Sequence, residues 1–236
     1  YKYENHTFDY LLKEIAEISG VERLRYTSPH PEDMTDDVLY VMAHYDNICN
    51  AVHFPLQAGS SRILNRMNRT YTKNHFIERA HRIREILPSC GLTTDIIVGF
   101  PGETNSDFEE TIDVMNKIKF DSAFTFKYSP RLGTKAHEYS DQISEMDKQE
   151  RLEKVIKLQK EHTLIRNKEI IGNNERVLVE KNSKRSINQW AGRTDSNKWV
   201  IFDKENAKIK DIVDVLITDA KGISLHGHLV KKKEAA

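Results

Sequence analysis

The segment from Thr93 to Thr104, which reads TTDIIVGFPGET, constrains the fold more than any other part of the chain. Its first part is β-branched and apolar, as expected of a buried strand, and the run breaks at Gly99. Pro101 and Gly102 predict a turn, after which Thr104 is positioned to cap a helix. Such a turn exposes backbone at the carboxyl end of a strand, where α/β proteins hold phosphate- or adenosine-bearing ligands. An ordinary βα turn without a ligand remains the alternative.

Apolar periodicity predicts alternating helices and strands on both sides of this segment. Helices are expected over about 7–20, 35–44, 60–67, 72–87 and 107–117, with Thr7, Thr72 and Thr104 as caps. Strands are expected over about 21–27, 48–55, 92–98 and 123–128. Repeated βα units indicate a parallel sheet with helices outside it. The expected fold class is therefore α/β, with parallel strands as in part of a (β/α) barrel.

Polar residues and glycines follow each predicted strand. In parallel sheets and barrels, ligands bind at the carboxyl ends of the strands. We therefore expect one binding site, built from Ser28–Pro31, then His53, Pro55, Gln57, Gly59 and Ser60, then Asp95 and Gly99–Glu103, then Tyr128, Ser129, Arg131 and Gly133.

The last third of the chain has a different pattern. A long helix over about 147–168 is predicted to pack through an apolar set made of Leu152, Val155, Ile156, Leu158 and Ile165. Five short strands then follow, over about 175–180, 189–193, 199–202, 212–217 and 224–230, which predicts a small, closed or nearly closed β-barrel. The expected domains are 1–170 and 171–233.

Charge is unevenly distributed between these domains. The whole chain has zero formal net charge, but residues 168–236 carry more basic than acidic side chains. Such a tail indicates contact with a polyanion, although an ordinary solvated basic surface has the same composition. Small barrels commonly bind RNA through basic loops, so the candidate RNA-binding residues are Lys181, Lys184, Arg185 and Arg193. Trp190 is a candidate for base stacking, with a core position as the alternative.

Composition excludes several classes of protein. Cys49 and Cys90 are the only cysteines, too few for a disulfide scaffold or a structural metal site, so both are expected to be reduced and packed. No apolar run approaches the length that a bilayer requires, and no charged-then-apolar leader opens the chain. We therefore expect a cytoplasmic protein without membrane contact.

Four ordered motifs resemble the methylthiotransferases, which are radical S-adenosylmethionine (SAM) enzymes. They are His53–Ser61, Met67–Thr72, Asp95–Thr104 and Tyr128–Thr134. In the tail, Lys184–Ser186 and Gly192–Thr194 resemble the TRAM domain of that family. The resemblance covers essentially all 236 residues and is greatest to the tRNA branch, of MiaB type, which makes 2-methylthio-N6-isopentenyladenosine. It implies SAM and the anticodon stem-loop of tRNA as ligands, and we expect a monomer.

The resemblance also implies roles for individual residues. Gln57, Arg69 and Asp95 match the positions that hold SAM in related barrels, and Ser60, Gly99 and Gly102 are further cofactor-binding candidates. These roles are chemically reasonable. Arg69 can pair bidentately with the methionyl carboxylate, while Asp95 and Gln57 can bind ribose hydroxyls or the amino group.

One feature of the family is missing from the sequence. The family binds a [4Fe–4S] cluster through C-x3-C-x2-C and an auxiliary cluster through three more cysteines, and Cys49 and Cys90 match neither set. Iron–sulfur clusters need several thiolates placed together. The resemblance therefore implies that this chain is the carboxyl-terminal part of a longer enzyme, whose cluster ligands lie outside it.

Several alternatives stay open. Within the family, the substrate could be threonylcarbamoyl-adenosine or an aspartate of a ribosomal protein. In another class, the chain would be a non-catalytic RNA-binding module. In a third, His53 and Asp95 would serve as acid and base in a metal-independent barrel enzyme.

Overall fold

The computed structural model describes residues 2–3, 6–27 and 30–230. The predicted contribution of Ser28 and Pro29 to the binding site, and the end of the second predicted domain beyond residue 230, lie outside the described residues. Among the helices in the described part of the chain, not one combines the length and apolarity needed to cross a membrane.

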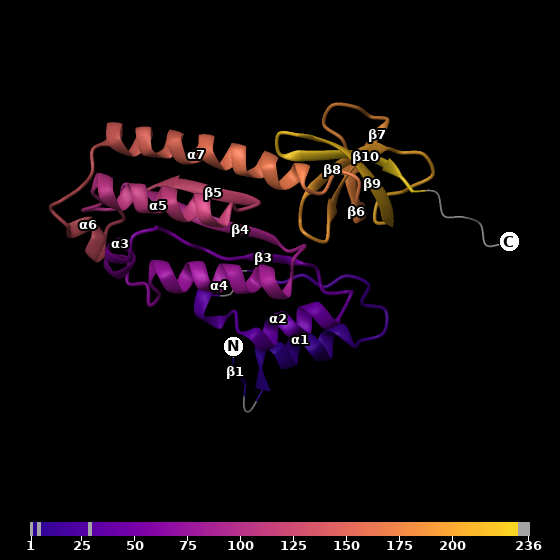
Figure 1. The fold of residues 1–236 in the computed structure, drawn as a ribbon, viewed down its shortest axis with the longest axis horizontal. Coiled ribbons are helices and arrows are strands. Elements are labelled where there is room, and N and C mark those ends of the chain that lie inside the picture. Colours follow the sequence, from indigo (N-terminus) through magenta and orange to yellow (C-terminus); the bar gives the residue numbers. More distant parts are fainter. Residues whose placement is uncertain (1, 4–5, 28–29, 231–236) are drawn as a thin grey trace.

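The first part of the chain is built around a parallel sheet of three strands in the order β3-β4-β5. The strands are β3 (Ala51–His53), β4 (Gly91–Val98) and β5 (Ser122–Lys127). The helices are α1 (Phe8–Ala16), α2 (Asp36–His44), α3 (Ser61–Arg66), α4 (Lys73–Ile86), α5 (Asn105–Ile118), α6 (Lys135–Glu138) and α7 (Glu145–Lys168), with a 3-10 turn at Pro31–Asp33. Figure 1 shows α4, α5 and α7 side by side along the sheet, where α4 contacts α5 and α5 contacts α7, so these three helices cover the same face. Helices α1 and α2 lie beyond α4.

The predicted α/β class is confirmed, and two of the three predicted caps are confirmed in detail. The hydroxyl of Thr104 accepts from the backbone N–H of Asp107, and the Asp107 carboxylate accepts from the N–H of Thr104, which is a capping box. Thr72 caps α4 in the usual way by accepting from His75. Thr7 precedes α1 but makes no side-chain cap bond, so that predicted cap is wrong.

The first predicted strand is wrong. Residues 21–27 form no strand, and only a single parallel bridge joins Leu24 to Ile48. The backbone N–H of Leu24 donates to Asn47, and its carbonyl accepts from Cys49, so pairing stops after one position. The neighbouring arginines explain why, because the side chains of Arg23 and Arg25 donate hydrogen bonds to backbone carbonyls of the β-barrel. A hairpin of β1 (Lys2–Tyr3) and β2 (His6–Thr7) and the short α6 were not predicted.

The two faces of the sheet differ. On the helix-covered side, Phe54, Phe76 and Phe120 are fully buried in the main core. The other face is open, and there Phe124 is 60% and Phe126 51% exposed. Alternation along β5 therefore places its aromatic side chains on a face that the described residues do not cover, next to the site described below.

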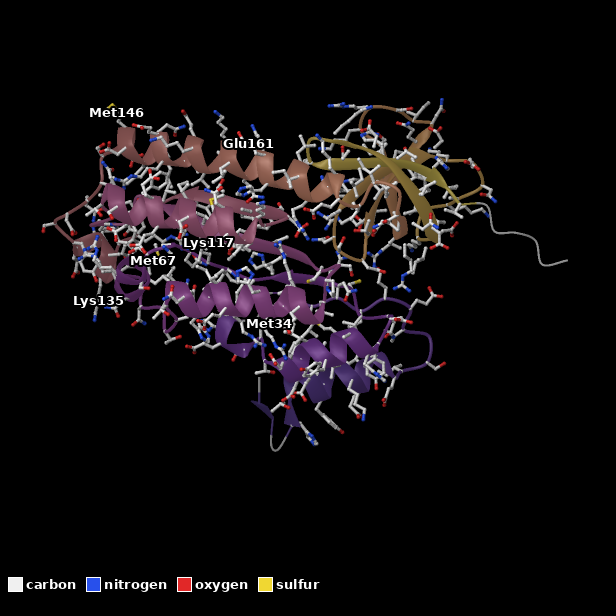
Figure 2. All side chains as sticks on the ribbon, in the orientation of Figure 1. Met34, Met67, Lys117, Lys135, Met146 and Glu161 are labelled. Carbon is white, nitrogen blue, oxygen red and sulfur yellow. The ribbon has the colours of Figure 1, made fainter. Side chains whose placement is uncertain are left out.

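Helix α7 packs differently from the prediction. Of the predicted apolar set, only Val155 is buried, and Ile165 is 42% exposed. The buried face is mostly polar, and its members are Lys148, Arg151, Gln159, His162, Thr163 and Asn167. Figure 2 shows Met146 and Glu161 on the outer side of this helix, away from the sheet.

The second part of the chain is a closed barrel of five strands in the order β10-β8-β7-β6-β9, as predicted. The strands are β6 (Asn174–Asn182), β7 (Gln189–Thr194), β8 (Trp199–Asp203), β9 (Ile212–Lys221) and β10 (Ser224–Leu229). A separate apolar core fills it, made of residues such as Val177, Val200, Phe202 and Ile217. Figure 1 shows the barrel at the carboxyl end of α7.

Polar contacts join the barrel to the α/β part. Asp195 lies between Arg23 and Arg176, with N–O distances of 3.1 and 2.9 Å. Arg25 donates to the carbonyl of Thr194 at 3.1 Å. Because these contacts lie at the amino-terminal ends of the sheet strands, the barrel sits opposite the strand ends that were predicted to bind a ligand.

Candidate functional site: a groove at the strand ends

A groove of about 1080 Å³ opens at the carboxyl ends of β4 and β5. Three residues predicted to bind SAM, Gln57, Arg69 and Asp95, all line it. The rest of the lining includes four aromatic side chains, Phe100, Phe126, Tyr128 and Tyr139, together with further polar and basic residues. The groove therefore combines a few polar groups with flat apolar surface, which is the usual character of a small-molecule site.

Gln57 has an unusual backbone conformation. Its φ is +66°, in the left-handed region that non-glycine residues seldom occupy. Its N–H donates to Asp95 O, and its carbonyl accepts from Ile97 N–H, both at 2.8 Å, so the residue extends the sheet by one bridge. Among the described residues its side-chain amide has no hydrogen-bond partner. Backbone strain of this kind costs about 1–3 kcal/mol and is typical of functional sites.

Arg69 brings a cation to the same groove. Its Nε is buried, and the guanidinium makes no hydrogen bond or ion pair within the described part of the chain. The preceding Asn68 has a φ of +57°, and Arg69 N–H donates to the carbonyl of Leu64, so the backbone here is fixed by the end of α3. A half-buried guanidinium without an acidic partner is suited to a carboxylate or phosphate ligand.

Asp95 is paired rather than free. One oxygen lies 3.2 Å from Nε2 of His53, and Nδ1 of the same ring lies 3.0 Å from the hydroxyl of Thr93. Both ring nitrogens of His53 are therefore occupied by the protein. An acid or base must present a nitrogen to its substrate, so this geometry does not favour the metal-independent alternative. Instead, His53 orients Asp95 and leaves the second carboxylate oxygen for a ligand.

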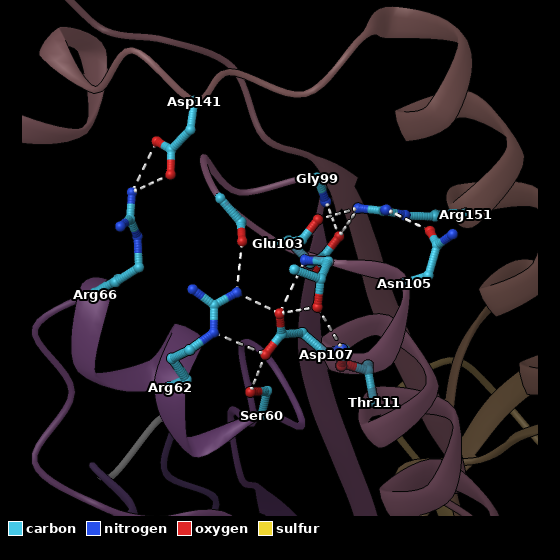
Figure 3. Close-up of polar contacts among 12 residues, drawn as sticks. Ser60, Arg62, Arg66, Gly99, Glu103, Asn105, Asp107, Thr111, Asp141 and Arg151 are labelled. Atoms are coloured by element: carbon cyan, nitrogen blue, oxygen red, sulfur yellow. Dashed lines mark hydrogen bonds and ion pairs between the residues drawn. The ribbon is translucent and has the colours of Figure 1, made fainter.

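Behind the groove, the turn between β4 and α5 is held by two carboxylates, shown in Figure 3. Glu103 is buried, and its Oε2 accepts from Gly99 N–H at 2.7 Å and from Arg151 at 2.6 Å. Burial raises the pKa of Glu103, while the Gly99 and Arg151 contacts oppose this rise. Arg151 also donates to the backbone carbonyl of Glu103, so one residue of α7 fixes the turn.

Asp107 is the second carboxylate of this turn. It accepts hydrogen bonds from Ser60, Arg62 and Thr104. Burial on its own would raise the pKa of Asp107, but these hydrogen bonds outweigh it and hold the pKa well below its usual range. The turn thus contains two carboxylates, four positions apart, whose pKa values move in opposite directions.

Three cofactor-binding candidates, Ser60, Gly99 and Gly102, do not line the groove among the described residues. Ser60 is buried and donates to Asp107 at 2.6 Å. The N–H groups of Gly99 and Gly102 are both bonded within the protein, to Glu103 and Asp141. The turn therefore does not offer these two amides to a ligand, contrary to the expectation of exposed backbone.

The glycines of this turn have packing reasons as well. Both have positive φ, +72° at Gly99 and +78° at Gly102. A Cβ at Gly99 would lie 2.3 Å from Cγ of Lys148, and one at Gly102 would lie 2.4 Å from the carboxylate of Asp141. Close packing of α7 and of the segment before it therefore requires glycine at both positions.

The cysteines are free and buried, as predicted. Burial raises the pKa of the Cys90 thiol to about 12, which disfavours the thiolate that a metal needs. Cys49 accepts a hydrogen bond from Arg23 at the contact with the barrel. Within residues 2–3, 6–27 and 30–230, no group of three His, Cys, Asp or Glu side chains is arranged to hold a metal ion. The described residues therefore do not fit an iron–sulfur cluster.

The basic candidates of the barrel fall into two groups. Lys184 and Arg185 are exposed in the loop between β6 and β7. Lys181 and Arg193 instead lie over the ring of Trp199, with the charged groups 4.3 and 4.4 Å from its centroid. Trp199 was missed, although its pairing with Arg193 across β7 and β8 was implicit in the predicted strands.

Trp190 takes the alternative role. Its Nε1 donates to the carbonyl of Ala207 at 2.9 Å, and its ring packs against the barrel core. Lys204 lies 4.0 Å above the ring. Trp190 is thus a structural residue with a polar edge satisfied by backbone.

Sequence reasoning also missed Arg66, which lines the groove. Its guanidinium lies 4.5 Å over the ring of Tyr139 and donates to Asp141 at 2.9 and 3.0 Å. The ion pair of Arg66 with Asp141, drawn in Figure 3, ties α3 to the segment between α6 and α7. No local pattern identifies such a pair, because its partners are 75 positions apart.

Comparison with known proteins assigns both parts of the chain. Residues 4–115 match the family model of the radical SAM superfamily, and residues 168–230 match that of the TRAM domain. Among solved structures, coproporphyrinogen III oxidase (HemN) from Escherichia coli superposes with a TM-score of 0.50 at 14% identity, covering 73% of this chain and 46% of that one. At this identity the likeness concerns the fold alone.

Curated relatives extend the match across both domains. The tRNA-2-methylthio-N(6)-dimethylallyladenosine synthase of Thermoanaerobacter sp. (strain X514) is 43% identical over 228 residues, which is 97% of this chain and 48% of the relative. The synthase of Carboxydothermus hydrogenoformans is 45% identical over 94% of this chain and 51% of its own length. The chain thus spans about half the length of these relatives. The chain matches a radical SAM segment followed by a TRAM domain, and over nearly its whole length it is similar to radical SAM tRNA methylthiotransferases.

Proposed function

We propose that this chain supplies the SAM-binding groove and the tRNA-binding module of a methylthiotransferase that modifies C2 of N6-isopentenyladenosine next to the anticodon. Residues 1–170 would bind SAM, and residues 171–233 would bind the anticodon stem-loop. The observation that carries the proposal is the convergence of Gln57, Arg69 and Asp95 in one groove, in a chain 43% identical to a named synthase. We further propose that the protein is a cytoplasmic monomer.

The residues of the groove fit SAM. Arg69 has no acidic partner among the described residues and would bind the methionyl carboxylate bidentately. Asp95, oriented by His53, would accept from ribose hydroxyls through its free oxygen, and the amide of Gln57 would bind the same sugar or the amino group. The aromatic walls would cover the adenine and exclude water from it.

When bound, SAM would supply the methyl group and the radical chemistry of the reaction. A [4Fe–4S] cluster does not fit the described residues, and its ligands would lie outside this chain. The part played by this chain is therefore to orient SAM and to grip the RNA. The turn fixed by Glu103 and Asp107 would keep the groove in shape while a substrate enters.

A chimera tests the proposal. The 228 matching residues of this chain would replace their counterparts in the Thermoanaerobacter synthase, in a host that lacks its own enzyme. Mass spectrometry of digested tRNA should then show 2-methylthio-N6-isopentenyladenosine. A methylthio group on threonylcarbamoyl-adenosine or on a ribosomal protein would select another branch. A folded, cluster-loaded chimera that modifies nothing would refute the proposal and favour a non-catalytic RNA-binding module.

A further inference from the structure

The groove carries more positive charge than SAM explains. Its lining contains five basic side chains and a single acidic one, Asp95, which is already paired with His53. The basic residues are Arg66, Arg69, Lys127, Arg131 and Lys135. SAM has a single carboxylate, together with a cationic sulfonium and a cationic amino group. It can therefore neutralise one of these side chains and would be repelled by the rest.

Two of the five are neutralised by the protein. Arg66 pairs with Asp141 at 2.9 Å, and Lys127 pairs with Glu145 at 3.3 Å. Arg69 is assigned to the SAM carboxylate. Arg131 and Lys135 remain, and neither makes an ion pair within the described part of the chain.

Both remaining cations lie at the mouth of the groove. They belong to the segment between β5 and α7, where their side chains are exposed. The hydroxyl and N–H of Thr134 both bond to the carbonyl of Arg131, at 2.8 and 3.2 Å, which fixes the backbone between them. Figure 2 shows Lys135 at the end of the molecule opposite the β-barrel.

An RNA substrate would bring phosphates to this mouth. An enzyme that acts on a base takes it out of the stack into a pocket, so the backbone on either side of that nucleotide lies at the entrance. Each flanking nucleotide contributes one negative charge. Leu132, 88% exposed between the two cations, adds apolar surface for a neighbouring base.

We propose that Arg131 and Lys135 bind the backbone phosphates that flank the target nucleotide, as a second RNA contact apart from the barrel. This inference rests on the proposed function. Helix α7 separates the two contacts, and at 1.5 Å per residue its 24 residues span about 36 Å. The target nucleotide and its flanking phosphates therefore occupy only the mouth of the groove, and the barrel would hold another part of the same stem-loop. The two contacts should then contribute independently to affinity.

Salt-dependent binding tests the inference. The chain would be titrated with a fluorescent anticodon stem-loop that carries N6-isopentenyladenosine, across a series of salt concentrations. Each phosphate contact with single-stranded RNA contributes about −0.7 to the slope of log K against log salt. Arg131→Gln with Lys135→Gln should therefore flatten the slope by about 1.4. Lys184→Gln with Arg185→Gln should do the same, and combining all four should give the sum.

A matched control removes two charges elsewhere. Lys13 and Lys119 are exposed, line no part of the groove and make no ion pair within the described residues. Lys13→Gln with Lys119→Gln should leave the slope unchanged. The inference is overturned if the Arg131 and Lys135 variant keeps the original slope, or if the control flattens it equally. If the unmodified chain shows no salt-dependent RNA binding, the proposed function fails instead.

Discussion

Replacing Arg151 by methionine should destabilise the α/β part in a pH-dependent way. After the change, Glu103 is still buried but has lost its cationic partner. It keeps only the hydrogen bond from the Gly99 N–H, and water does not reach it. Breaking a buried ion pair by removing one partner typically costs about 3–5 kcal/mol. The side chains here are 1% and 10% exposed, so the buried range applies rather than the smaller cost of a surface pair.

The pH dependence follows from the pKa of Glu103, which burial already raises above its ordinary value of 4.5. A carboxyl with a raised folded pKa contributes most to stability below its unfolded pKa, and this contribution is lost as pH rises through the folded value. Without Arg151 the pKa of Glu103 in the folded protein rises further, so more stability is lost as the pH rises. The difference in free energy of unfolding between wild type and Arg151→Met should therefore be large at about pH 8 and should shrink toward about pH 5.

Arg62→Met provides the contrasting variant. Asp107 keeps its hydrogen bonds from Ser60 and Thr104, and Arg62 is 50% exposed, so the expected cost is about 0–1 kcal/mol. The pKa of Asp107 is held below its ordinary value of 3.8, so the stability that ionised Asp107 contributes is lost only as pH falls below that value. Between about pH 8 and pH 5, the effect of Arg62→Met on the free energy of unfolding should not change.

Denaturant unfolding can follow the two domains separately. All α-helices of the described chain lie before residue 170, and both tryptophans lie in the β-barrel. Circular dichroism of the helices therefore reports the α/β part, and tryptophan fluorescence reports the barrel. Adding Glu103→Gln to Arg151→Met removes the buried charge and should recover most of the loss. A loss that is equal at both pH values, or not recovered by Glu103→Gln, would refute the role given to Glu103 ionisation.

Three further predictions concern the proposed function. In a complete enzyme, Arg69→Ala should weaken SAM binding by about 1.5–3 kcal/mol, the range for a hydrogen bond to a charged group, as measured by equilibrium dialysis; an affinity unchanged within about twofold would remove Arg69 from the site. Anaerobic reconstitution of this chain alone should give no stoichiometric [4Fe–4S] cluster by iron and sulfide analysis, and a cluster lost on replacing Cys49 or Cys90 would contradict this. Residues 173–236 expressed alone should fold, with dispersed amide signals in NMR, because the barrel has its own core; an unfolded spectrum would show that the barrel depends on contacts with the α/β part, such as that of Asp195 with Arg23.

Local signals predicted the elements that depend on nearby residues. The caps at Thr104 and Thr72 and the five barrel strands were predicted, because caps and strand alternation involve residues a few positions apart. The segment 21–27 failed for the opposite reason. Its β-forming pattern is real, but Arg23 and Arg25 have partners about 170 positions away that hold it against the barrel.

The candidate site was predicted as a set of residues but not as a geometry. Gln57, Arg69 and Asp95 were placed by resemblance, and the structure brings them to one groove. The positive φ of Gln57 could not be foreseen, because propensity alone would assign glycine or asparagine to that conformation. The pairing of His53 with Asp95 depends on the register of β3 against β4, which no single-strand pattern specifies.

The buried polar face of α7 could not be predicted from the sequence, and it fixes the position of this helix. Its buried side chains are mostly polar, so sequence periodicity assigns that face to solvent. Three of them are instead matched to distant groups: Arg151 to the Glu103 turn, Gln159 to the carbonyl of Phe120 at 2.8 Å, and Asn167 to the carbonyl of Gly222 and to Lys198. Buried polar groups stay favourable only while these bonds are made, so α7 has one position relative to the sheet and the barrel. The same helix thereby fixes the groove at one end and the basic loop at the other. A tRNA held by Lys184 and Arg185 must reach Arg131 across that fixed length, which makes the spacing of the two contacts a property of the fold.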